Sequence, residues 1–156
     1  MSRFHILVWG AGDLPPVVCL HRVRGHARRF ERVARMMTGE RRVIAYDLRG
    51  HGRSPWSGPH TLAQHAADLD EVLEEVGAGQ VVLVGDGFGC RVALEYTAAH
   101  GARVTALALL EPPLRPAPER MRELAAGERR SKIYANTDAA IAEWAGMPAA
   151  TTRRAR

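Results

Sequence analysis

Four polar residues stand at the ends of apolar runs, where a sheet could present them for chemistry. They are His21, Asp47, Asp86 and Glu111. In open α/β sheets, ligands bind in the crevice outside the carboxyl ends of the strands, so these positions are candidates for a site. If the four strands are neighbours, one imidazole and three carboxylates could together hold a divalent metal ion. The alternative, which we favour, is that Asp47 and His21 brace their loops and that no metal is bound.

A parallel sheet is needed to position these residues, and the sequence carries the pattern of one. Five nearly continuous runs of Val, Ile and Leu alternate with helical segments; the runs are Phe4–Trp9, Val17–Leu20, Val43–Tyr46, Val81–Val84 and Val104–Leu110. Continuous runs of this kind are typical of strands buried on both faces. The sequence therefore predicts an α/β fold with a mainly parallel sheet of about five strands and helices on both faces. The first two runs are joined by only Gly10–Pro16, so their strands should lie apart or antiparallel.

Three helices are expected between the runs. The first carries an apolar stripe of Phe30, Val33, Ala34 and Met37, and the third covers about Arg91–Ala99. The second begins after Thr61, with Gln64 three residues later as a capping-box partner. Its acidic residues should lie mostly on the solvated face; they are Asp68, Asp70, Glu71, Glu74 and Glu75.

Composition limits the classes of partner. The 156 residues carry a net charge of +5, but the arginines are scattered, so we expect no nucleic-acid partner. No apolar run reaches the roughly 18 residues that cross a bilayer, so we expect no membrane partner and a cytoplasmic protein. Cys19 and Cys90 have no metal-binding or disulfide spacing, and nothing indicates a cofactor.

Four motifs in order resemble one family, the α/β-hydrolases of the esterase and non-haem peroxidase-like branch. Pro15–His21 resembles its third strand, and Arg42–Ser54 resembles its fourth strand with the D-x-R-G-x-G-x-S loop. Val81–Gly89 resembles the fifth strand and the G-x-S-x-G nucleophile elbow, and Leu107–Pro112 resembles the sixth strand and its exit. The resemblance implies that residues 1–113 form the N-terminal part of a hydrolase core.

The segment after this core has a different pattern. Residues 114–148 should form a short helical segment similar to the start of the family's lid, and residues 149–156 a disordered basic tail.

The central position of the elbow is Gly87, which has no side chain to act as a nucleophile. The neighbours Asp86 and Cys90 lie one residue early and three residues late, so we interpret them as a loop hydrogen-bonder and a small buried filler. The resemblance also implies an oxyanion hole at the backbone N–H groups of Val23 and Phe88. Arg22 replaces the glycine of the oxyanion loop and should disturb the approach to it.

The family's charge-relay acid and histidine lie after its seventh and eighth strands, before which this sequence stops, so we expect a truncated relative. A minority of members place the acid at the position of Glu111. The leading interpretation is a catalytically deficient hydrolase-like protein, a pseudoenzyme whose crevice could still bind a small molecule.

Two alternatives stay open. One is a weak or unconventional hydrolase of small esters or lactones. The other is an interaction module that associates, for example as a homo-oligomer, through an exposed edge strand at residues 104–110.

Overall fold

The computed structural model describes residues 2–37, 39–113, 118, 119, 122, 123 and 126. The chain divides into two compact units, Met1–Arg115 and Pro116–Arg156, and all the strands and helices named below belong to the first. Of the predicted lid-like segment 114–148, the five described residues are helical; its remainder and the predicted tail 149–156 lie outside the described residues. None of the helices in the described part is long and apolar enough to cross a membrane.

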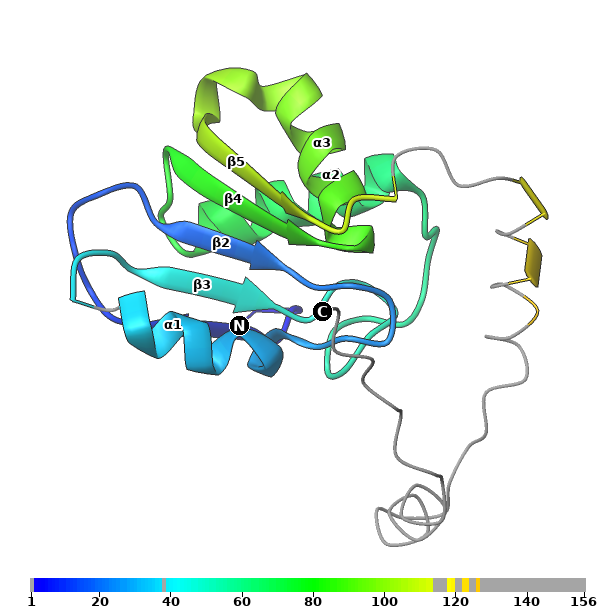
Figure 1. Cartoon of the computed structure of the whole chain (residues 1–156), viewed down its shortest axis with the longest axis horizontal. Coiled ribbons are helices and arrows are strands. Elements are labelled where there is room, and N and C mark those ends of the chain that lie inside the picture. The colour runs from blue at the N-terminus through cyan, green and yellow to red at the C-terminus, as the bar shows by residue number, and fades with distance from the viewer. Residues whose placement is uncertain (1, 38, 114–117, 120–121, 124–125, 127–156) are drawn as a thin grey trace, which may run out of the picture. The chain divides into compact units, whose positions relative to one another are not determined.

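Five strands form one sheet in the order β1-β3-β2-β4-β5. The parallel strands are β2 (Val17–Leu20), β3 (Val43–Tyr46), β4 (Val81–Asp86) and β5 (Val104–Leu110), and β1 (Ile6–Trp9) is antiparallel to β3. The predicted mainly parallel sheet is therefore confirmed (Figure 1). β1 and β2 are not neighbours, as their short connection predicted.

Helices cover both faces of the sheet (Figure 1). The 3-10 turn η1 (Ala27–Phe30) and α1 (Glu31–Met37) pack on one face, where Phe30 and Ala34 join the cluster around Val43 and Ala45. α2 (Leu62–Glu75) and α3 (Phe88–His100), followed by the short η2 (Gly101–Arg103), belong to the larger core on the other face. β2 and β3 are buried along their whole length, as strands between two helical layers must be.

The first helix differs from the predicted stripe. Phe30 and Ala34 are buried, but Val33 is 53% exposed and Met37 is also exposed. The chain enters this helix through a 3-10 turn, which has three residues per turn, so Ala27 takes the third buried position instead.

The other two helices are close to the predictions. Thr61 caps α2, and its Oγ1 accepts a hydrogen bond from the Gln64 N–H at 3.2 Å, as predicted. The Gln64 side chain donates to Asp68 and does not complete the capping box. α3 begins at Phe88, three residues before the predicted start, because the helix follows Gly87 directly.

Candidate functional site

The turn between β4 and α3 has the conformation of an elbow. Gly87 joins the strand to the helix with φ 54° and ψ −112°, a conformation that favours glycine. A Cβ on Gly85 would lie 2.6 Å from the Cα of Cys90, and a Cβ on Gly89 would collide with the carbonyl oxygen of Leu20. Close packing against backbone therefore requires Gly85 and Gly89, and the positive φ favours glycine at 87. The turn stands at the carboxyl end of the sheet.

Arg22 occupies the space beside Gly87. A Cβ on Gly87 would lie 2.9 Å from the Cβ of Arg22 and 3.9 Å from its Nε. Two Cβ atoms do not normally approach so closely, so a serine at this position would require Arg22 to move. The Arg22 side chain therefore lies against this turn, and its predicted effect on the oxyanion loop remains a prediction.

An ionic cluster holds Arg22 in this position. Its guanidinium donates to both oxygens of Asp86, with Nη2 2.5 Å from Oδ1 and Nε 3.0 Å from Oδ2, and Nη2 also lies 2.8 Å from Oε2 of Glu111. Arg29 reaches the same Asp86 carboxylate at 2.8 Å. The hydrogen bonds to Asp86 and then to Glu111 raise the pKa of Arg22 above its ordinary value. Two of the three predicted crevice carboxylates, Asp86 and Glu111, are thus engaged by arginine.

His21 uses both of its ring nitrogens to hold backbone. Nδ1 lies 2.8 Å from the carbonyl oxygen of Arg22, and Nε2 accepts the N–H of Leu48 at 2.9 Å, which together assign the Nδ1–H tautomer. The ring is completely buried and makes an edge contact with His51, and burial lowers its pKa to about 4. His21 therefore braces two loops and has no nitrogen available to accept a proton from a substrate.

Asp47 is also fully engaged. Its carboxylate accepts the N–H of Ala27 at 2.7 Å and the N–H of Arg53 at 3.0 Å, and it lies 3.0 Å from Nδ1 of His5. Burial alone would raise the pKa of Asp47, but these hydrogen bonds outweigh it and the net shift is downward. Asp47 thus fixes the loops around the end of β3.

The four predicted residues follow neighbouring strands, in the order β3-β2-β4-β5, but they do not form one ligand set. The part of the chain that the structure describes holds no group of three or more His, Cys, Asp or Glu residues suited to a metal ion. The metal hypothesis is therefore wrong for these residues. Arg22 binds both Asp86 and Glu111, and backbone groups bind Asp47 and His21.

Cys90 lies beneath the turn as a buried filler. Its Sγ is 3.1 Å from the carbonyl oxygen of Gly85 and 3.2 Å from that of Leu110, which places the S–H as a donor. Burial is the largest influence on its pKa and raises it, so the thiol form is favoured. Ser54, which ends the fourth-strand motif, accepts the N–H of His5 at 3.1 Å and so has a loop role.

The two predicted oxyanion residues, Val23 and Phe88, lie next to the contact between Arg22 and Gly87. Val23 follows Arg22, and Phe88 follows Gly87 as the first residue of α3, where helix N–H groups lack intrahelical partners. Arg22 and Gly87 bring these two segments together. The oxyanion role of Val23 and Phe88 remains a prediction.

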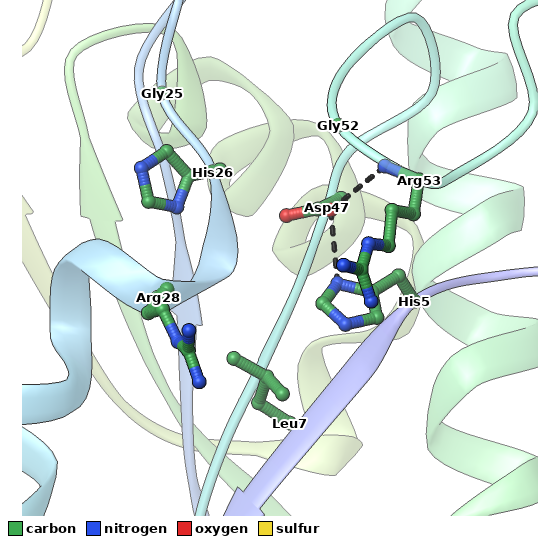
Figure 2. Close-up of a pocket in the computed structure, with 8 residues that line it drawn as sticks. All are labelled: His5, Leu7, Gly25, His26, Arg28, Asp47, Gly52 and Arg53. Atoms are coloured by element: carbon green, nitrogen blue, oxygen red, sulfur yellow. Dashed lines mark hydrogen bonds and ion pairs between the residues drawn. The ribbon is translucent and has the colours of Figure 1, made fainter. Parts of the chain in front are cut away.

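A pocket of about 430 Å³ beside β1 and η1 was not predicted from the sequence (Figure 2). Its polar lining includes His5, His26, Arg28 and Arg53, which come from three separate segments of the chain. Arg53 belongs to the D-x-R-G-x-G-x-S loop, but no motif connects it with His5 or with His26 and Arg28, so only the folded chain reveals the pocket.

Comparison with protein families supports the motif analysis. A family model described as the alpha/beta hydrolase fold matches residues 15–153. Lipase LipV of Mycobacterium tuberculosis is 36% identical over 139 residues, which are 89% of this chain and 53% of that lipase. A non-heme haloperoxidase of Rhodococcus erythropolis is 44% identical over 70 residues, which are 44% of this chain and 26% of the relative.

Solved structures give the same picture. A thermophilic esterase from Thermogutta terrifontis matches with a TM-score of 0.72 and 28% identity, covering 82% of this chain and 48% of the esterase. Est816, titled an N-acyl homoserine lactone degrading enzyme, matches with a TM-score of 0.69 and 25% identity, covering 82% of this chain and 49% of that enzyme. The chain thus spans about half the length of each of these two structures.

Proposed function

The chain belongs to the α/β-hydrolase fold family, and on that premise we propose that it is a catalytically deficient relative of lipases and esterases. One observation carries the proposal: the central residue of the elbow is Gly87, and the Cβ of Arg22 lies only 2.9 Å from where a Cβ on that residue would be. In a working triad, losing the nucleophile alone can cost about 10⁶ in kcat.

The neighbouring groups support this proposal because each has another partner. Asp86 is bound by two arginines, His21 uses both ring nitrogens, and the Cys90 thiol donates to backbone carbonyls. A substitute nucleophile would have to leave one of these interactions.

The proposal is tested by hydrolysis of p-nitrophenyl acetate and p-nitrophenyl butyrate. We expect background rates for the native chain, for Gly87→Ser, and for Arg22→Gly/Gly87→Ser, in which space for the hydroxyl is restored. Activity of the native chain that survives purification and disappears in Asp86→Asn would contradict the proposal.

That contradicting result is what the first alternative expects, namely a weak or unconventional hydrolase of small esters or lactones. The similarity to Est816 and to the Thermogutta terrifontis esterase favours this substrate class over others. Including an acyl homoserine lactone in the assay extends the test to ring opening.

The second alternative is association with another copy through β5. Within the described sheet this strand pairs only with β4, and its exposed residues include Ala106, Ala108 and Leu110. Unpaired apolar edges favour strand-to-strand pairing. Light scattering after size exclusion should then show a dimer that Ala108→Lys disrupts and that Val33→Lys, on the exposed side of α1, leaves intact.

A further inference from the structure

The pocket beside β1 and η1 is distinct from the Gly87 turn. Its volume of about 430 Å³ falls within the range of small-molecule sites. Neither Gly87 nor Arg22 nor Asp86 lines it. An inference about this pocket is therefore independent of whether the elbow is catalytically deficient.

The lining is rich in cationic and hydrogen-bond-donating groups. Figure 2 shows His26 and Arg28 on one side and His5 and Arg53 on the other, with Leu7 between them. The one carboxylate in the lining, Asp47, already accepts two backbone N–H groups and contacts His5. The pocket thus has a surplus of donors over acceptors.

Several of these donors are available to a ligand. Within the described residues, the Arg53 guanidinium and the His26 ring have no hydrogen-bond or ion-pair partner. Arg28 makes one exposed ion pair with Glu31 at 3.5 Å, an interaction of a kind that contributes little and is easily exchanged.

We propose that this pocket binds the phosphate group of a small phosphomonoester. A carboxylate has two oxygens, which a single arginine fork can satisfy. A phosphate has three terminal oxygens and nearly two negative charges at neutral pH. It can therefore accept hydrogen bonds from the donors on both sides of the pocket at once. Leu7, between the two walls, offers an apolar contact to the organic part of the ester.

The test measures phenyl phosphate binding to the full chain by calorimetry at low ionic strength and neutral pH. We expect saturable binding that Arg28→Ala and Arg53→Ala each weaken about tenfold, because each removes a charge-assisted donor. Arg32→Ala is the matched control, since Arg32 is exposed on the neighbouring α1 and does not line the pocket; it should change affinity less than about twofold. Benzoate, the carboxylate of similar size, should bind at least about tenfold more weakly than phenyl phosphate.

Arg53→Ala keeps the backbone N–H that Asp47 accepts, so this variant should fold, and circular dichroism verifies it. Amide shifts in NMR spectra should centre on Ala27 and Arg53. The proposal is overturned if phenyl phosphate does not bind saturably, if Arg32→Ala weakens binding as much as the pocket variants, or if benzoate binds equally well. Amide shifts centred on Phe88 instead would also overturn it.

Discussion

The Cβ of Arg22 lies 2.9 Å from the position that a Cβ on Gly87 would take. Asp86, the residue before Gly87, holds Arg22 there through a contact of 2.5 Å between Oδ1 and Nη2. The residue that leads into the turn therefore also anchors the side chain that covers it. Arg22 can pack at this distance because residue 87 has no side chain, so a larger residue at 87 requires Arg22 to move or to be replaced.

Gly87→Ala should lower the free energy of unfolding by about 2 kcal/mol, because it combines a positive φ with an overpacked contact. Urea denaturation followed by circular dichroism measures this. Two variant backgrounds separate the cost of the positive φ from the cost of the contact with Arg22. Arg22→Ala keeps the Cβ but loses the ion pairs, whereas Arg22→Gly loses both. We expect the cost of Gly87→Ala to be similar in the native and Arg22→Ala backgrounds and about 1 kcal/mol smaller with Arg22→Gly. An equal cost in all three would show that the contact with Arg22 contributes nothing.

A buried ion pair between Arg49 and Asp68 should stabilise the loop that follows β3. Nε lies 2.8 Å from Oδ2 and Nη2 2.5 Å from Oδ1, and Asp68 is completely buried. Asp68→Asn leaves the guanidinium buried without its counter-charge, so the free energy of unfolding should fall by about 3–5 kcal/mol. Glu75→Gln, on the exposed part of the same helix, should change it by less than about 0.5 kcal/mol. Near-native stability of Asp68→Asn would refute the assigned role.

The sheet could be predicted from the sequence because its signal is local. Continuous apolar runs mark strands buried on both faces, and β2 and β3 are such strands. The spacing of Gly85, Gly87 and Gly89 likewise indicates a tight turn whose backbone packs closely against neighbouring segments. These features depend on residues close together in the chain.

The arrangement of charges could not be predicted in this way. Asp68 was expected among the solvated acids of α2, but it is buried against Arg49, 19 residues earlier. Arg22 and Asp86, 64 residues apart, meet only because β2 and β4 are neighbours in the sheet. Helical periodicity records which face a residue occupies and not which distant loop covers that face. For the same reason, the sequence could not show that Arg22 binds the carboxylates at the ends of β4 and β5.

The fold should lose stability on acidification between about pH 6.5 and pH 4. Burial lowers the pKa of His21 and of His65 to about 4 from 6.5. The unfolded chain therefore takes up these protons first, so the stabilisation is complete above pH 6.5 and is lost as the pH falls toward 4. At about pH 5, each histidine should cost on the order of 2 kcal/mol. The lowered pKa of Asp47 acts only below its ordinary value of 3.8, outside this window.

Urea denaturation at about pH 7.5 and about pH 5 measures this dependence. His65→Leu should remove about half of the loss between the two conditions, because its buried ring no longer titrates. His100→Gln is the matched control and should leave the loss unchanged, because His100 stacks on Tyr96 and is not among the groups that shift the pKa of His21 or His65. A loss that persists in full in His65→Leu would assign the acid sensitivity to other groups.

Neither cysteine should react with a thiol reagent while the chain is folded. Cys19 is buried, and burial raises its pKa to about 12, so only about one molecule in 10⁴ is thiolate at about pH 8. Cys90 is completely buried, burial raises its pKa as well, and its S–H is directed at the carbonyl oxygens of Gly85 and Leu110. Ellman's reagent should therefore detect almost no thiol in the native chain and both thiols in concentrated guanidinium chloride. The single variants Cys19→Ala and Cys90→Ala assign any residual reaction to one position. Rapid native-state labelling that disappears in Cys90→Ala would place a reactive thiol beside the Gly87 turn, and the assignment of Cys90 as a buried filler would then be wrong.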